Sequence, residues 1–203
     1  APPMTSSVRP RPLWFVVLVG AAFSLILAGC GSSVDSSNKP ATKANVAADF
    51  GLDGLQAKEV IDKLDQMPVA QRPDGLSASV TPQALILTDS KEREQRLEMP
   101  SDMSYVSVAP YVKKTHECHF HALTSCLGEL KNAAVKVTVK DSESGEVIKQ
   151  ESTKTFDNGF VGLWLPRGVK GQVSIEYADK SGSADFSTLN DDDATCVTTL
   201  KLS

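Results

Sequence analysis

The pattern of hydrophobic and polar positions predicts a helix at the start of the folded part of the chain. In residues 46–67, the apolar side chains Leu55, Ile61 and Leu64 recur at roughly helical spacing, with charged side chains between them. Pro68 follows, and a proline of this kind ends a helix. We therefore expect one helix over residues 46–67.

Two short apolar runs come next and are typical of a β-hairpin. Residues 76–80 alternate between apolar and polar side chains, residues 81–83 read Thr-Pro-Gln, and residues 84–87 are apolar again. Residues 91–98 are highly charged, and their pattern allows either a short helix or an exposed loop. Residues 46–100 are therefore expected to form a small α/β N-terminal lobe.

Beyond residue 100 the pattern is typical of short β-strands. Alternating positions or compact apolar runs mark the strand candidates 105–112, 135–139, 147–155, 160–165, 173–177 and 196–202. The Asp-Asn-Gly sequence at residues 157–159 is a strong turn signal, and Pro110 interrupts the first candidate. Strands at this spacing predict a β-rich, antiparallel, sandwich-like domain over residues 101–203, so the fold class is α+β.

The first segment has the pattern of a bacterial lipoprotein signal peptide. Arg9 and Arg11 precede an apolar run, which ends in Leu-Ala-Gly immediately before Cys30. Small residues before a cysteine admit the signal peptidase, and the thiol of that cysteine receives the lipid. Residues 1–29 are then removed, and Cys30 becomes the lipidated N-terminus.

The polar residues that follow, 30–45, suit a flexible tether. The alternative is an uncleaved membrane anchor, but an apolar run that extends only over residues 13–29 is at the lower limit for a membrane-spanning helix.

The composition of the chain limits the classes of partner that it can bind. Hydrophobic residues make up 41% of the chain and charged residues 23%, so most of it should fold. The formal net charge is -4, and the absence of a basic surplus argues against nucleic acid. The chain has 4 cysteines, and lipidation of Cys30 would leave an odd number. In an exported protein, an odd count points to a metal site, a redox cycle or an intermolecular bridge.

The chemistry of the chain is concentrated around Cys118. All three histidines, His116, His119 and His121, lie within six residues around this cysteine, and Cys126 follows shortly after. Thiolate and imidazole are ligands for Cu(I), Cu(II) and Zn(II), and thiolate favours Cu(I). This clustering predicts a metal or redox site.

Backbone geometry limits which of these side chains can act together. In an extended strand, His116 and Cys118 would face one way and His119 and His121 the other. A turn or helical start at residues 122–123 could bring the next cysteine back towards the cluster.

The last cysteine, Cys196, can reach the site only if its strand pairs near residues 116–126. Sulfurs more than about 8 Å apart could not share one metal ion, because metal–thiolate bonds are a little over 2 Å long. Exported thiols meet an oxidising compartment. Two of Cys118, Cys126 and Cys196 are therefore expected to form a reversible disulfide in the metal-free protein.

Less specific interpretations exist for each of these residues. Cys196 could be a core cysteine or could form a structural disulfide with Cys126, and the histidines could lie in a solvated loop.

Other motifs are missing from the sequence. It contains no Cys-x-x-Cys, no Walker A or dinucleotide fingerprint and no Gly-x-Ser-x-Gly elbow, and the acidic run 191–193 lacks EF-hand spacing.

The same residues resemble the CueP family of extracytoplasmic copper-binding proteins. The matching segments are residues 105–112, Thr115 to His116, Cys118, Phe120 to His121, Cys126, and residues 128–130, 158–160, 163–167 and 195–199. The resemblance covers most of the mature chain and is weaker in the N-terminal lobe. It implies copper tolerance outside the cytoplasm, with the three cysteines handling copper. His116 and His121 fall at motif positions, whereas His119 falls at a variable one.

We therefore predict a lipoprotein outside the cytoplasm, at the cell surface or in the periplasm, that binds copper at Cys118, Cys126, Cys196, His116 and His121. It would sequester copper or pass it on, and its thiols could reduce Cu(II) to Cu(I). The reduction is stoichiometric unless an outside reductant restores the thiols, so no enzyme class is assigned. The expected partners are copper, the membrane, and a copper-accepting or thiol-reducing protein.

Two alternatives belong to other classes. One is a thiol–disulfide redox protein in which metal binding is incidental. The other is a structural β-sandwich lipoprotein with a disulfide and one spare thiol.

Overall fold

Two short helices begin the part of the chain that the computed structural model describes, residues 43–203. They are α1 (Val46–Asp49) and α2 (Ala57–Asp65). The prediction of one helix over residues 46–67 is wrong, because Gly51 and Gly54 have φ angles of 67° and 76° and turn the chain between the two helices. The signal peptide, Cys30 and most of the tether lie outside the described residues.

No helix within the described residues is long and apolar enough to cross a membrane.

The predicted hairpin is confirmed. After the short 3-10 helix η1 (Val69–Gln71), strand β1 (Leu76–Val80) pairs antiparallel with β2 (Ala84–Asp89). The prediction of a helix or loop over residues 91–98 is wrong, because β3 (Glu94–Glu98) pairs with β2 as an edge strand. An edge strand is exposed along its length, so its charged side chains reach solvent without disturbing the ladder.

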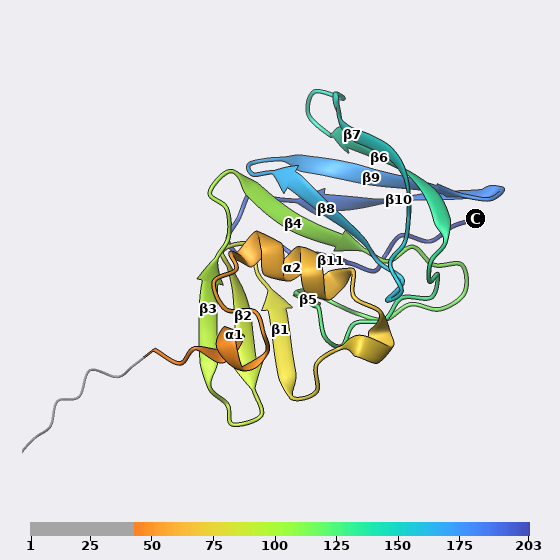
Figure 1. Cartoon of the computed structure of the whole chain (residues 1–203). Coiled ribbons are helices and arrows are strands. Elements are labelled where there is room, and N and C mark those ends of the chain that lie inside the picture. The colour runs from red at the N-terminus through yellow and green to blue at the C-terminus, as the bar shows by residue number, and fades with distance from the viewer. Residues whose placement is uncertain (1–42) are drawn as a thin grey trace, which may run out of the picture. The chain divides into compact units, whose positions relative to one another are not determined.

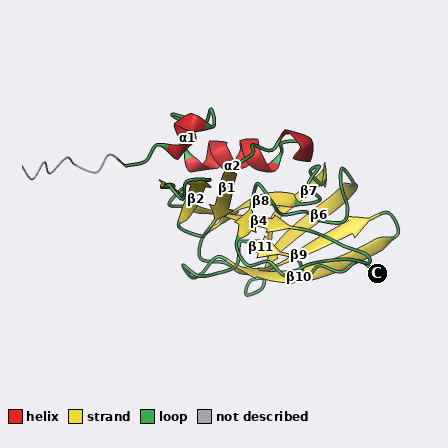
Figure 2. Cartoon of the chain, turned by 90° about the horizontal axis from the view of Figure 1, so that it is seen from below, coloured by secondary structure: helices red, strands yellow, loops and turns green. Residues whose placement is uncertain are grey.

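A short strand from the second half of the chain completes this sheet. β5 (His121–Ala122) pairs antiparallel with β1, which gives the order β3-β2-β1-β5. Both helices lie on one face of this sheet (Figures 1 and 2). Apolar side chains of α1 and α2 pack there against Leu85, Leu87 and Leu123 in one buried cluster.

Two further sheets form the sandwich. The first has the order β11-β4-β8, with β4 (Met103–Val108) antiparallel to β8 (Val161–Pro166) and parallel to β11 (Cys196–Val197). The second sheet is antiparallel and has the order β10-β9-β6-β7; its strands are β6 (Ala134–Asp141), β7 (Val147–Lys154), β9 (Lys170–Tyr177) and β10 (Lys180–Ser187). A core of valine, leucine and isoleucine side chains from both sheets fills the space between them. The β-rich, antiparallel, sandwich-like character that was predicted is thus present.

Three strands of the sandwich differ from the prediction. Strand β4 ends at Val108, before the end of the predicted range 105–112. Strand β10 was not predicted, because this edge strand buries only Ala184 and Phe186. The strand predicted over residues 196–202 is shorter, since only β11 and an isolated bridge between Tyr111 and Lys201 are formed.

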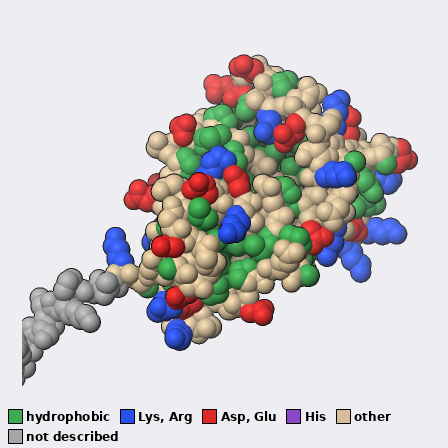
Figure 3. Space-filling model, in the orientation of Figure 1, with side chains coloured by type: hydrophobic (Ala, Val, Ile, Leu, Met, Phe, Trp, Pro, Cys, Tyr) green, Lys and Arg blue, Asp and Glu red, His purple; other side chains and the backbone are tan. Residues whose placement is uncertain are grey.

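Strand β4 is buried on both faces, and this links the sandwich to the helices. Val106 and Val108 belong to the sandwich core. Tyr105 and Ser107 point to the other face, where their hydroxyls reach the end of α2. Elsewhere on the molecule, Figure 3 shows acidic and basic side chains interspersed over the visible face.

Candidate metal centre

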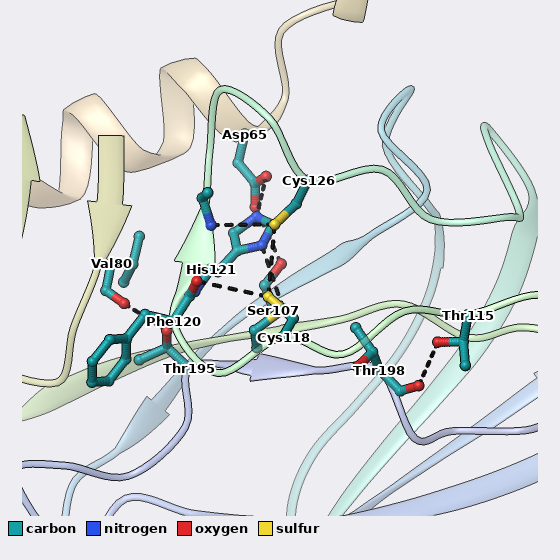
Figure 4. The surroundings of a disulfide bond; sticks show 12 residues. Asp65, Val80, Ser107, Thr115, Cys118, Phe120, His121, Cys126, Thr195 and Thr198 are labelled. Carbon is teal, nitrogen blue, oxygen red and sulfur yellow. Dashed lines mark hydrogen bonds and ion pairs between the residues drawn. A yellow bond between two sulfur atoms is a disulfide. The ribbon is translucent and has the colours of Figure 1, made fainter. Parts of the chain in front are cut away.

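Cys118 and Cys196 form a disulfide, although they are 78 positions apart (Figure 4). Strand β11 lies beside the cysteine loop because the backbone N–H groups of Thr195 and Cys196 both donate to the carbonyl of His119, at 2.9 and 3.1 Å. The condition for Cys196 to reach the site, pairing of its strand near residues 116–126, is therefore met. The expected disulfide between two of the three cysteines is confirmed, while the suggested pair Cys126–Cys196 is not the one formed.

Cys126 is the free cysteine, and a tight turn brings it back to the cluster. Its backbone N–H donates to the carbonyl of Ala122 at 3.0 Å, and the N–H of Ala122 donates to its Sγ at 3.4 Å. As a result, the Sγ atoms of Cys126 and Cys118 are 3.7 Å apart. The turn expected after residue 122 is confirmed.

His121 occupies the buried side of the site. Its backbone N–H donates to Oγ1 of Thr195, and that hydroxyl in turn donates to the carbonyl of Val80. The imidazole is fully buried, with Nδ1 3.9 Å from the Sγ of Cys196 and Nε2 2.8 Å from Oδ1 of Asp65. One nitrogen therefore faces the sulfurs and the other faces the end of α2.

The five predicted ligands form two overlapping groups that share Cys126. His116, Cys118 and Cys126 form the outer group, and His121, Cys126 and Cys196 form the inner group. In each group the candidate ligand atoms lie within 4.8 Å of one another, well inside the distance that would prevent them from sharing an ion. The outer group is partly exposed through His116, whereas the inner group is largely buried.

His119 does not join either group. Its Nε2 lies 2.9 Å from the carbonyl oxygen of Asp192, in the acidic turn that precedes β11.

Asp65 is a member of the site that sequence reasoning missed. It is fully buried at the end of α2, and it receives hydrogen bonds from Tyr105, His121 and Asn158, with Ser107 at 3.4 Å. A signal existed, because Asp65 continues the buried face of the helix; the members of that face are Ala57, Val60, Ile61, Leu64 and Asp65. A carboxylate on an apolar helical face needs a buried partner.

The charges at the site raise the pKa of His121 and lower the pKa of Cys126. Burial alone would lower the pKa of His121, but the charge and hydrogen bond of Asp65, with a smaller contribution from Cys126, raise that pKa to about 9. Burial would raise the pKa of the Cys126 thiol, but its interactions with His121, the Ala122 N–H and Arg72 lower it below its usual value. The free sulfur is therefore shifted towards the thiolate, which is the nucleophilic and metal-binding form.

Backbone contacts hold the loops around the site. The carboxylate of Glu129 accepts hydrogen bonds from the N–H groups of Val112, Lys113 and Lys114, which fixes the segment leading to His116. The guanidinium of Arg72 donates to the carbonyl of Cys126 at 2.8 Å.

A close pair of glycines fixes the other side of the cysteine turn. The N–H of Gly128 donates to the carbonyl of Asn158 at 2.6 Å. A Cβ on Gly128 would lie 2.7 Å from the carbonyl oxygen of Gly159, so the two backbones can approach only without side chains.

Two shallow pockets reach the sulfurs from the surface. Cys126 lies in one, together with Leu127, and Cys118 lies in the other, together with Thr198. His116 lines both pockets. An ion or a small thiol can therefore approach both sulfurs from the side of His116.

Comparison with known proteins identifies the family. Residues 59–201 match the sequence profile of the family described as periplasmic copper-binding protein CueP. A crystal structure described as that of S.CueP is 38% identical, with 77% of this chain and 94% of that chain covered and a TM-score of 0.71. No match was found among the curated proteins. The predicted resemblance is confirmed, and copper, the predicted metal, is the one in the family's description. The chain therefore belongs to the CueP family of periplasmic copper-binding proteins.

Proposed function

We propose that this protein binds copper through Cys118, Cys126, Cys196, His116 and His121, and then holds the metal or passes it on. The observation that carries the proposal is that three sulfurs and two imidazoles converge, with Cys126 common to both ligand groups. Thiolates match the preference of Cu(I), and imidazole also accepts Cu(II). A role in copper tolerance follows from capture of copper outside the cytoplasm.

The disulfide makes copper binding depend on the redox state. In the oxidised protein Cys118 and Cys196 are bonded to each other, so each ligand group keeps only one thiol, that of Cys126. Reduction returns one thiol to each group, so that each then has two. The reduced protein is therefore the form that binds Cu(I) tightly, and the oxidised form, in which Cys126 is the one thiol of the site, binds it more weakly.

The same thiols can reduce Cu(II). Two thiols lose one electron each and close one disulfide, while two Cu(II) ions become two Cu(I) ions and two protons are released. The reaction is stoichiometric, so a continued cycle requires an outside dithiol that reduces the disulfide again. Cys126 remains outside the observed disulfide and can keep one Cu(I).

The test uses the fully reduced protein under nitrogen. Cu(II) is added, and Cu(I) is followed with a chelator specific for that ion. We expect up to two Cu(I) for each disulfide formed, and slower formation of Cu(I) by each of Cys118→Ser, Cys126→Ser and Cys196→Ser, because each variant lacks one candidate copper ligand. If all three variants formed Cu(I) as fast as the wild type, reduction at this site would be excluded. Displacement of bound Cu(I) by an equal concentration of zinc would exclude a preference for copper.

A second candidate function is thiol–disulfide exchange without metal. The observation that favours it is the free thiol of Cys126 at 3.7 Å from a disulfide sulfur. Rapid reduction of a model disulfide substrate by the reduced protein, in the presence of a metal chelator, would support this alternative. Slow exchange together with tight copper binding would support the first.

We also propose that the protein is attached to a membrane by lipid on Cys30. The support is the lipobox, Leu-Ala-Gly before the cysteine. Labelled fatty acid should appear on the wild type and not on Cys30→Ala, which should accumulate as the uncleaved precursor. Lipid label on that variant would contradict the assignment.

A further inference from the structure

The carboxylate of Asp65 lies behind His121, on the side away from the sulfurs. It is the last residue of α2, and it is separated by 56 positions from the histidine that it contacts. Both side chains are fully buried, and their contact joins the helical layer to the cysteine loop (Figure 4).

The hydrogen bonds around Asp65 determine which atoms carry protons. The amide oxygen of Asn158 accepts the N–H of Phe160 at 2.9 Å, so the amide nitrogen of Asn158 must face Asp65, where it donates to Oδ1 at 2.7 Å. The other oxygen of Asp65, Oδ2, accepts a hydrogen bond from the Tyr105 hydroxyl. An ionised carboxylate only accepts hydrogen bonds, and therefore Nε2 of His121 must carry the hydrogen that joins the two side chains.

With a hydrogen held on Nε2, His121 can bind a metal only through Nδ1, which gives up its own proton when the ion binds. This atom is on the sulfur side, 3.9 Å from the Sγ of Cys196. The ring is also packed against Phe160, with 4.5 Å between the ring centroids, so it is not free to exchange its two nitrogens.

We propose that Asp65 is a positioning residue that holds His121 with Nε2 protonated and Nδ1 directed at the copper bound by Cys126 and Cys196. This inference rests on the proposed copper site and adds the group that orients its buried histidine. A carboxylate on the far nitrogen fixes the tautomer and raises the basicity of the ligating one, and losing such a partner typically weakens metal binding about 10–100-fold.

The alternative is that Asp65 only helps the helix to pack. In that case its replacement would lower stability but leave the copper affinity of the folded protein unchanged. Asp65→Asn separates the two possibilities. The new amide can keep its oxygen towards His121 and Asn158 and turn its NH₂ towards the hydroxyls of Tyr105 and Ser107, which can rotate to accept. The substitution Asp65→Asn therefore keeps the shape of the side chain and removes its charge.

The matched control is Val137→Ala. Val137 is fully buried in the sandwich core, so its truncation lowers stability without touching the site. Cu(I) affinity is measured for the reduced proteins by competition with a chromophoric chelator, at a temperature where thermal melting shows all of them folded. We expect Asp65→Asn to bind Cu(I) about 10–100-fold more weakly than the wild type, and Val137→Ala to bind within about twofold.

A second readout does not depend on affinity. In the metal-free protein, nitrogen-15 NMR should show an exchange-protected, downfield proton on Nε2 of His121, because a charge-assisted hydrogen bond holds it. This proton should move upfield in Asp65→Asn and stay in place in Val137→Ala. When Cu(I) is added to the wild type, the proton on Nε2 should remain, because the metal binds at Nδ1.

The outcomes separate the two proposals. Loss of the proton on Nε2 when Cu(I) binds to the wild type would overturn the inference even if Asp65→Asn failed to fold. Equal Cu(I) affinity of the wild type and Asp65→Asn would overturn the positioning role and leave the copper proposal standing. A wild type that bound no copper would overturn both.

Discussion

The free thiol of Cys126 lies 3.7 Å from the Sγ of Cys118, and Cys118 is bonded to Cys196. Cys118 is therefore the central sulfur of the three, with a bonded partner on one side and a thiol on the other. Exchange of disulfides proceeds by attack of a thiolate on one sulfur of an existing bond. The arrangement allows the bond to move to Cys118–Cys126, which releases Cys196 beside His121.

The first prediction is that Cys196→Ser forms the other disulfide. When the reduced variant is oxidised by air without metal, Cys118 and Cys126 should join, since their sulfurs are already in contact. Peptide mapping by mass spectrometry under non-reducing conditions should find this bond within one chain. The matched control, Cys126→Ser, should keep Cys118–Cys196. Two unreacted thiols in oxidised Cys196→Ser would contradict the prediction.

The second prediction concerns the stability of the metal-free protein as the pH changes. The pKa of His121 is raised to about 9 when folded, chiefly by Asp65 acting against burial, compared with about 6.5 when unfolded. Its contribution to the free energy of unfolding is thus complete below pH 6.5 and is lost as the pH rises through about 9. Asp65 has a lowered pKa, so its contribution is present above about pH 4 and is lost in acid.

The measurement is chemical denaturation between pH 4 and 10 in a Cys126→Ser background, which removes the titration of the neighbouring thiol. The free energy of unfolding should fall as the pH rises from 6.5 towards 9, and the fall should be smaller than the wild-type pKa of His121 implies, because the contribution of Cys126 to that pKa is absent. Adding His119→Gln, which changes an exposed histidine outside the site, should leave the curve unchanged. A free energy of unfolding that did not change over this interval would show that Asp65 does not raise the pKa of His121 in the folded protein.

The third prediction tests the space around the Tyr105 hydroxyl. A Cβ at Gly162, on the neighbouring strand β8, would lie 1.8 Å from that hydroxyl, which reaches Asp65 only because the glycine leaves room. Gly162→Ala should therefore lower the free energy of unfolding by about 2–3 kcal/mol, the cost of overpacking.

The partner variant is Tyr105→Phe, which removes the oxygen that would clash. Part of the cost of Gly162→Ala should disappear in the double variant, so the two changes should not be additive by about 1 kcal/mol or more in urea denaturation. Strict additivity would show that the alanine is accommodated elsewhere.

The sequence predicts the sandwich and the clustering of the candidate ligands, because both have strong local signals. Alternation of valine with polar residues marks strands such as β6, and the histidines stand next to Cys118 in the chain. The sequence predicts poorly where helices end and which segments form the edge strands of the sheets. β3 and β10 are edge strands whose polar side chains resemble loops, and the break between α1 and α2 depends on the conformation of two glycines.

The sequence does not reveal the residues that lie behind the candidate ligands and hold His121 in place. Asp65 approaches His121 across 56 positions of sequence, and Tyr105 and Asn158 come from two further segments. No spacing rule connects such residues, since only the packing of α2 against β4 and β5 brings them together. The disulfide pair was also left open, because three cysteines allow three pairings and only the contact between β11 and the His119 carbonyl selects one.

The last prediction uses His116 and His119 as a matched pair. They are three positions apart in the same exposed loop, but His116 lies with Cys118 and Cys126, whereas the ring of His119 is hydrogen-bonded to the carbonyl of Asp192 on another side. Imidazole is the ligand at the open side of the site that suits Cu(II). His116→Ala should therefore weaken Cu(II) binding by about tenfold or more, a loss of about 1.4 kcal/mol. His119→Ala should change Cu(II) affinity by less than about twofold.

The measurement is Cu(II) competition with a weak chelator. It is made on the oxidised protein, so that electron transfer from a pair of thiols cannot reduce the ion. An equal effect of both histidine variants in the oxidised protein would mean that Cu(II) binds to the loop without using the outer ligand group.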